Sequence, residues 1–195
     1  HHGYIPRVKA ALAAFGVPKD WLSVMLIQLV KLFRDGREIK MSKRAGSYVT
    51  LRELIDEVGV DAVRFIFLTK RHDSPLDFDM DLAVRQDSEN PVYYVQYAHA
   101  RICSVFRKAE REGALSEAPG PADLDRLELE EEMALIRQMA GFPSLVKDMA
   151  DTLEPHRLTY YLADLAASFH RYFNLGNKDP NARIIVPDAG TTRAR

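Results

Sequence analysis

The change in pattern at Asn90-Pro91 constrains the fold most strongly. Asparagine is favoured as the residue that caps a helix N-terminus, and proline is favoured at the first helical position. From this pair onward, apolar residues recur at helical spacing, with interruptions by glycine and proline and no strand signal. We therefore predict an antiparallel helical bundle, with helices over 90–112, 125–140, 143–153 and 155–175.

The residues before Asn90 combine helix and strand signals. Residues 6–15 have a helical pattern that Gly16 ends, whereas the apolar residues 23–34 favour a buried strand. Asp35-Gly36 is a strong signal for a tight turn, so residues 37–41 are predicted to return as the second strand of a hairpin.

Two short helices and a connector are expected after the hairpin. Thr50 and Glu53 have the spacing of a capping box, which predicts a helix that Gly59 ends. Asp61 can cap a second helix over 62–69, and the polar residues 71–81 are expected to form a loop. The predicted fold is therefore mostly α with a small β-hairpin, divided into domains at 1–87 and 88–195.

The distribution of charge limits how the chain can meet nucleic acid. The net charge is −1, but residues 1–85 carry 14 Lys/Arg against 11 Asp/Glu, whereas residues 86–195 carry 13 against 17. Any contact with nucleic acid must therefore use local patches, because the overall field is weak. The acidic residues Glu128 and 130–132 are expected to form a solvated helix face.

The basic sequence Lys40-Met41-Ser42-Lys43-Arg44 directly follows the predicted hairpin. Two lysines three residues apart, separated by a hydroxyl donor, can stabilise the charge that builds on pyrophosphate when the α-phosphorus of ATP is attacked. The alternative is a solvated basic turn without a function, because short motifs recur by chance.

The helix predicted from Asn90 carries residues that suit RNA. Single-stranded loops are recognised by stacking of bases on aromatic rings and by arginine contacts. This helix offers such chemistry through Tyr93, Tyr94, Tyr97, His99 and Arg101, of which Tyr93, Tyr97 and Arg101 are the candidate binding residues. Tyr94, Ala98 and Arg101 are expected on one face of this helix, and Tyr93, Tyr97 and Ala100 on another. One of these faces must be core, so any given tyrosine can be structural.

The later aromatic residues are expected to be core: Tyr160, Tyr161, Phe169 and Phe173. No metal site is predicted, because His156 and His170 have no partner at the spacing of metal ligands.

Four blocks of the sequence together resemble one family. The stretch 40–51, Lys-Met-Ser-Lys-Arg-Ala-Gly-Ser-Tyr-Val-Thr-Leu, resembles the signature of class I aminoacyl-tRNA synthetases in the form that the arginyl-tRNA synthetases have. Residues 1–10, 58–65 and 90–101 resemble the same family in the same order. The resemblance covers nearly the whole chain and weakens beyond Asn174.

The resemblance implies a function for each block. The first domain would be the end of a Rossmann-type catalytic domain, in which Lys40 and Lys43 serve the ATP phosphates. Residues assigned to ATP binding are Met41, Ser42, Arg44 and His2, although His2 can equally be a frayed terminal residue. The second domain would bind the anticodon loop of an arginine tRNA through Tyr93, Tyr97 and Arg101.

The resemblance also sets expectations for the whole enzyme. It implies ATP, L-arginine and tRNA as substrates, Mg²⁺ with the ATP, a monomeric state and a cytoplasmic location. The paired-histidine signature of the family is missing, and the family's last helices should continue beyond residue 195. We therefore expect a bundle truncated at its C-terminus and a chain that does not activate arginine alone.

Two other classes of function remain open. A different nucleotidyl-transfer enzyme could use the same lysine loop, but it would have no dedicated tRNA-binding helices. A helical interaction module without a nucleotide role would leave residues 40–44 unexplained.

Overall fold

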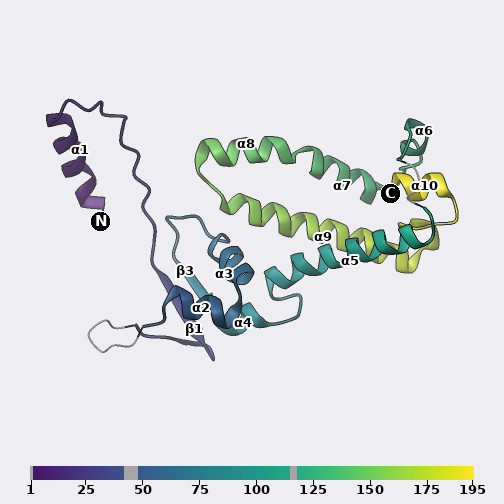
Figure 1. Cartoon of the computed structure of the whole chain (residues 1–195), viewed down its shortest axis with the longest axis horizontal. Coiled ribbons are helices and arrows are strands. Elements are labelled where there is room, and N and C mark those ends of the chain that lie inside the picture. The colour runs from purple at the N-terminus through teal and green to yellow at the C-terminus, as the bar shows by residue number, and fades with distance from the viewer. Residues whose placement is uncertain (1, 42–47, 115–117) are drawn as a thin grey trace.

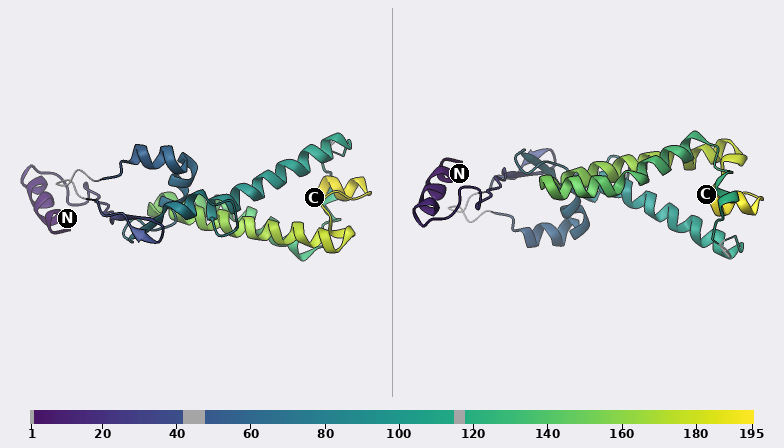
Figure 2. Two further views of the ribbon diagram at one scale, coloured as in Figure 1. Left: turned by 90° about the horizontal axis from the view of Figure 1, so that it is seen from below. Right: turned by 90° about the horizontal axis from the view of Figure 1, so that it is seen from above.

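The computed structural model describes residues 2–41, 48–114 and 118–195. The chain is elongated, with a small sheet and its covering helices near the middle and a helical bundle extending to one end (Figures 1 and 2). The described residues are mostly helical and form a three-stranded sheet, which confirms the predicted mostly α class. Among them, no helix is long and apolar enough to cross a membrane.

The sheet contains the predicted hairpin and one further strand. Strands β1 (Val30–Arg34) and β2 (Arg37–Glu38) pair antiparallel, and β1 also pairs in parallel with β3 (Leu76–Asp79). The turn residues Asp35 and Gly36 have φ values of 50° and 69°, which the Asp-Gly sequence tolerates. The tight turn was thus correctly predicted from the sequence.

Two predictions in this region are wrong. The strand expected over 23–34 forms only from Val30, since the preceding residues extend away from the sheet and Ile27 and Leu29 are 76% and 84% exposed. The connector expected over 71–81 contains β3 and the start of helix α4 (Met80–Val84). The alternation of buried Leu76 and Phe78 with aspartates is a strand signal that the polar composition concealed.

Helices α2 (Leu51–Val58), α3 (Val60–Phe67) and α4 cover the sheet. The capping box is confirmed, because the Thr50 side chain accepts from the Glu53 backbone N–H and the Glu53 carboxylate accepts from the Thr50 N–H. Asp61 is not a cap, because Gly59 occupies the N-cap position of α3 with a φ of 86°. The core of this part is centred on residues that are fully or almost fully buried: Leu32, Leu54, Val63, Phe78 and Met80.

The bundle consists of α5 (Pro91–Arg111), α7 (Glu130–Ala140), α8 (Phe142–Thr152) and α9 (His156–Lys178). Helix α9 packs against the other three, and its buried Ala166 and Phe169 meet Ala98 of α5. Gly176 was predicted to end this helix, but α9 continues through it to Lys178. An added Cβ there would lie 3.0 Å from the Arg183 Cα, so the glycine allows the following chain to pack closely.

The far end of the bundle is more ordered than the sequence suggested. Short elements α6 (Pro121–Leu124), η2 (Pro180–Ala182) and α10 (Ala189–Ala194) lie there, close to residue 195 (Figure 1). Glu132 was expected on a solvated face, but its side chain is only 3% exposed because it pairs with Arg195. At the opposite end, η1 (His2–Tyr4) and α1 (Ile5–Ala14) lie apart from the sheet and bundle (Figure 1).

Candidate functional site

The start of α5 is held rigidly against the sheet-covering helices. Asn90 is buried, and its side-chain oxygen accepts from the backbone N–H groups of Val92 and Tyr93. Its amide nitrogen donates to the carbonyl oxygens of Ala83, at 3.1 Å, and Arg85, at 2.8 Å. The predicted cap therefore also fixes the direction in which α5 leaves α4.

Tyr93, Tyr97 and Arg101 follow one another along one face of α5, and we call them the Tyr–Tyr–Arg row. The expectation that Arg101 lies on a different face from the two tyrosines is wrong, because residues four apart lie together on a helix. The rings of Tyr93 and Tyr97 are stacked, with centroids 5.9 Å apart and planes inclined by 8°. The Arg101 guanidinium lies 4.3 Å from the centroid of the Tyr97 ring and donates to the Tyr97 hydroxyl at 2.8 Å. Since Tyr97 is 41% exposed, the row presents an aromatic and cationic surface to solvent.

Helix α9 supports Arg101 from the other side. The guanidinium carbon lies 4.8 Å from the centroid of the Phe173 ring, so Arg101 is held between two aromatic rings. Arg101 Nη1 also lies 3.3 Å from His170 Nδ1. His170 is buried, and burial lowers the pKa of its imidazole, with the positive charge of Arg101 acting in the same direction.

The structure separates core aromatics from exposed ones. Ala98 is buried and Tyr94 is half-buried against α9, so this is the core face that the helical pattern required. On α9, Phe169 is buried and Phe173 is half-buried, as expected for core residues. Tyr160 does not follow this prediction, because it is 50% exposed and its hydroxyl donates to the Thr69 carbonyl.

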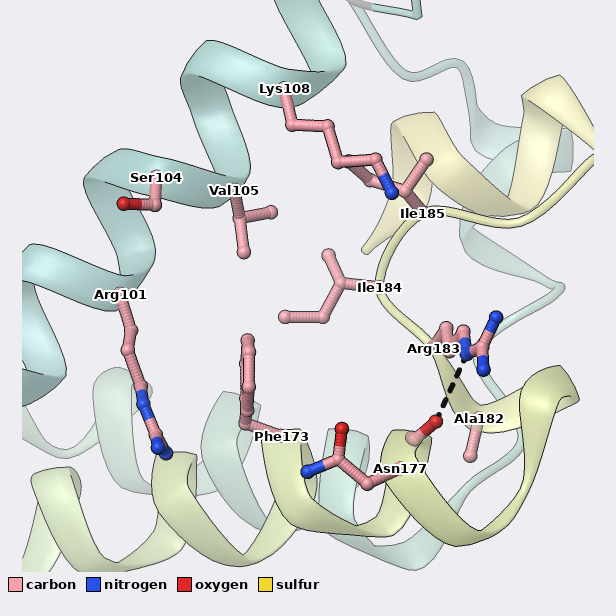
Figure 3. A pocket seen from close by; sticks show the side chains of 11 residues that line it. Arg101, Ser104, Val105, Lys108, Phe173, Asn177, Ala182, Arg183, Ile184 and Ile185 are labelled. Carbon is pink, nitrogen blue, oxygen red and sulfur yellow. Dashed lines mark hydrogen bonds between the residues drawn. The ribbon is translucent and has the colours of Figure 1, made fainter.

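A groove of about 280 Å³ continues from the row toward the end of the bundle (Figure 3). Arg101 and Lys108 reach into it from α5, while Phe173 of α9 and Ile184 form apolar walls. Its third side is the segment after α9, which is held by the hydrogen bond from Arg183 Nε to the Gly176 carbonyl at 3.1 Å. The groove therefore combines cationic groups with flat apolar surface.

Sequence reasoning missed the partners of Arg101 on α9. Phe173 was assigned to the core, and His170 was considered only as a metal ligand. Both lie at helical spacing from the buried Ala166 and Phe169, and this stripe could have placed them against α5. Their effect on Arg101 could not be deduced, because it depends on which helix packs opposite.

A second network closes the far end of the bundle. The Arg195 guanidinium, only 6% exposed, pairs with Glu132 and donates to the backbone carbonyls of Asn181 and Arg183. Glu132 also accepts from the Tyr172 hydroxyl at 3.2 Å. Burial raises the pKa of the Tyr172 phenol, so this hydroxyl stays protonated and remains a donor.

The predicted phosphate loop is described only in part. Lys40 and Met41 are exposed just after β2, and they follow Ile39, whose backbone N–H donates to the Leu32 carbonyl at 2.8 Å. Among the described residues, no carboxylate pairs with Lys40. Ser42, Lys43 and Arg44 lie outside the described residues.

The remaining site predictions concern His2 and metals. His2 is exposed in η1, on the segment that lies apart from the hairpin, so the structure does not bring it together with Lys40 (Figure 1). In the described ranges, no group of three or more His, Cys, Asp or Glu side chains could hold a metal ion.

The described part of the chain from α5 onward is an all-helical bundle with an aromatic and cationic helix face. The chain belongs to the DALR anticodon binding domain family, whose family model matches residues 95–195. That match begins inside α5, a few residues after the predicted boundary at 87–88.

Several arginine–tRNA ligases are similar to this chain over most or all of its length. The sequence is 51% identical to the enzyme of Syntrophotalea carbinolica over 195 residues, which is 100% of this chain and 34% of the relative. It is 58% identical to the enzyme of Aquifex aeolicus over 176 residues, 89% of this chain and 30% of the relative. The resemblance predicted from the motifs is confirmed, and the chain spans about a third of the length of these relatives.

Solved structures agree with the fold. An arginyl-tRNA synthetase structure from Campylobacter jejuni superimposes with a TM-score of 0.78 at 37% identity, covering 90% of this chain and 37% of that one. The Thermus thermophilus arginyl-tRNA synthetase gives a TM-score of 0.63 at 29% identity, with 86% and 30% of the two chains covered.

Proposed function

We propose that this chain is the part of an arginine–tRNA ligase that supplies the ATP-phosphate loop and the anticodon-binding surface. The whole enzyme would activate L-arginine with ATP and transfer it to its tRNA. The observation that carries the proposal is the Tyr–Tyr–Arg row, with Tyr97 exposed and Tyr93 and Arg101 half-buried, on a helix of a chain that belongs to an anticodon-binding family.

The row suits an unpaired RNA loop more than a duplex. Stacking on an aromatic side chain contributes roughly 1–3 kcal/mol per base, and every base has a face that can stack. Tyr97 offers an exposed ring, and Arg101 has N–H groups beyond those used by Tyr97 and His170. We assign the row to the loop bases and their phosphates.

The hairpin would serve the other substrate. We assign residues 1–87 to the end of a Rossmann-type catalytic domain and residues 88–195 to anticodon binding. Lys40 and Lys43 would neutralise the pyrophosphate as the arginine carboxylate attacks the α-phosphorus, with Ser42 as a further donor. Met41, Ser42, Arg44 and His2 are proposed as ATP-binding residues. The exposed Lys40, which has no carboxylate partner among the described residues, supports this role.

The remaining expectations for the whole enzyme stay proposals. We propose a cytoplasmic monomer that uses Mg²⁺ with ATP, the ion accompanying the phosphates. The described residues contain no metal-binding cluster of their own, so we assign no ligand to it. We also propose that the chain alone gives no ATP–pyrophosphate exchange.

The test is a fluorescence titration of the chain against an arginine tRNA and an unrelated tRNA, at two salt concentrations. We expect tighter binding of the arginine tRNA at both, with a similar salt slope for the two RNAs. Attraction to phosphates alone gives equal affinity for both RNAs at each salt concentration, and that result would overturn the proposal.

A further inference from the structure

His170 of α9 contacts two residues of the Tyr–Tyr–Arg row, Tyr97 and Arg101. It is buried between α5 and α9, with its ring 4.7 Å from the Tyr94 ring and 5.7 Å from the Tyr97 ring, centroid to centroid. A histidine in this position could be a simple packing residue. Its two ring nitrogens, however, make different hydrogen bonds across the helix interface.

These two bonds define the protonation state of the imidazole. Arg101 can only donate, so His170 Nδ1 must accept from Arg101 Nη1, which lies 3.3 Å away. The Tyr94 carbonyl can only accept, so His170 Nε2 must carry the proton that is donated to it across 3.4 Å. Both bonds exist together only when the ring is neutral and protonated on Nε2.

The bond to Nδ1 completes the cage around the Arg101 guanidinium. The guanidinium carbon lies 4.3 Å from the Tyr97 ring centroid and 4.8 Å from the Phe173 ring centroid, and the Tyr97 hydroxyl accepts from Nη2. His170 accepts from Nη1, so hydrogen bonds fix both terminal nitrogens. A guanidinium has five N–H groups, so the others stay available at the groove that Arg101 lines.

We propose that His170 is a positioning residue for RNA binding: its neutral Nδ1 holds the Arg101 guanidinium in the orientation that the RNA loop requires. This inference rests on the proposed function of the row. Protonation of His170 would remove the acceptor and place a second positive charge beside Arg101. Arg101 would then leave the cage, and the row would lose its cationic end.

Burial and the charge of Arg101 lower the pKa of the His170 imidazole, although the Tyr94 carbonyl, which accepts from His170 Nε2, favours the protonated ring. From α5, Arg101 is the charged group that faces the ring, and the phenols of Tyr94 and Tyr97 are its titratable neighbours. On α9 itself the adjacent ring is that of Phe169. In the part of the chain that the structure describes, no carboxylate forms an ion pair with the imidazole.

A double-mutant cycle tests the proposal, with the affinity of the chain for an arginine tRNA transcript as the measured quantity. His170→Phe keeps a ring of similar size but removes the acceptor, and we expect binding to weaken about tenfold, as for loss of one hydrogen bond to a charged group. In an Arg101→Ala background the same substitution should have no further effect, because His170 acts through Arg101. His156→Phe, on the same helix but away from α5, is the matched control.

A pH comparison tests the proposal when the phenylalanine variant does not fold. His170→Asn retains an oxygen that can accept from Arg101 but does not titrate, so it should restore most of the affinity that His170→Phe loses. The ratio of wild-type to His170→Asn affinity should fall severalfold as the pH is lowered from about 7.5 through the folded pKa of His170, which lies below the ordinary value of about 6.5.

The outcomes are distinguishable. Equal losses from His170→Phe with and without Arg101, or a constant wild-type to His170→Asn ratio across this pH range, would overturn the role of His170 while leaving the proposed function in place. A wild-type chain that does not distinguish the arginine tRNA from an unrelated tRNA would overturn both.

Discussion

The two proposed sites are built in different ways. The Tyr–Tyr–Arg row lies where α5 and α9 pack, and Arg101 is held by two aromatic rings and by two hydrogen bonds. Lys40 extends from the end of a two-residue strand and has no carboxylate partner among the described residues. A site formed by helix packing is ready before its ligand arrives, whereas a charged hairpin end depends on the ligand for its partners.

The largest expected effect concerns the packed end of the bundle. Glu132→Ala leaves the buried Arg195 guanidinium without its carboxylate, and loss of one partner of a buried pair costs about 3–5 kcal/mol. Chemical denaturation of the chain should show this loss in the free energy of unfolding. Glu130→Ala, which removes an exposed carboxylate paired with Arg137, is the control and should change little.

Replacing Lys43 should affect the proposed ATP site and leave the proposed tRNA site unchanged. We expect Lys43→Ala in the whole enzyme to slow adenylate formation about 10²–10³-fold, the cost of removing one group that stabilises transition-state charge. ATP–pyrophosphate exchange measures this, and tRNA affinity should stay unchanged. Lys31→Ala, an exposed lysine of β1 paired with Glu38, is the matched control. A parallel loss of tRNA affinity in Lys43→Ala would contradict the assignment of ATP and tRNA to two separate sites.

A smaller effect is expected from removing one ring of the row. Tyr97→Ala removes the ring on which Tyr93 stacks and over which Arg101 lies, so tRNA affinity should fall about tenfold. Tyr160→Ala removes a ring that is equally exposed but lies on α9 against Thr69, and it should bind tRNA as the wild type does. Equal losses in both variants would mean that exposed aromatics bind RNA without regard to position.

The smallest effect is the dependence of stability on pH. The pKa of His170 is lowered in the folded chain, so the unfolded chain takes up the proton first as the pH falls. The stability that His170 contributes is therefore complete above about pH 6.5, its unfolded value, and is lost as the pH falls through the lower folded value. Thermal unfolding at successive pH values should show a steeper loss above about pH 5 for the wild type than for His170→Asn.

The carboxylates do not interfere with that measurement. Hydrogen bonds from Arg193 and the Gly120 backbone lower the pKa of Asp123, and bonds from Thr191 lower that of Asp188. Stability that depends on these groups is retained above their unfolded values, near pH 4, and is lost only below them. A pH dependence above about pH 5 that is identical in the wild type and His170→Asn would contradict the proposed role of the imidazole.

Local signals in the sequence predicted the helix and turn boundaries best. The Asn90 cap, the Thr50–Glu53 capping box and the Asp35-Gly36 turn each depend on neighbouring residues, and all three are present. Strand β3 was missed because its aspartates concealed the alternating pattern, and the burial of Glu132 was missed because it depends on Arg195, a partner distant in the chain. The motifs predicted the family, and the candidate residues of α5 lie together as a row, but the cage around Arg101 needed the position of α9.

The most direct measurement of the central claim is binding of the chain to an isolated anticodon stem-loop of an arginine tRNA, compared with a duplex of the same stem without the loop. The row is assigned to unpaired bases, so the stem-loop should bind at least about tenfold more tightly than the duplex, and Tyr97→Ala should remove most of that difference. Equal affinity for the two RNAs, unchanged by Tyr97→Ala, would contradict the claim that α5 binds the loop.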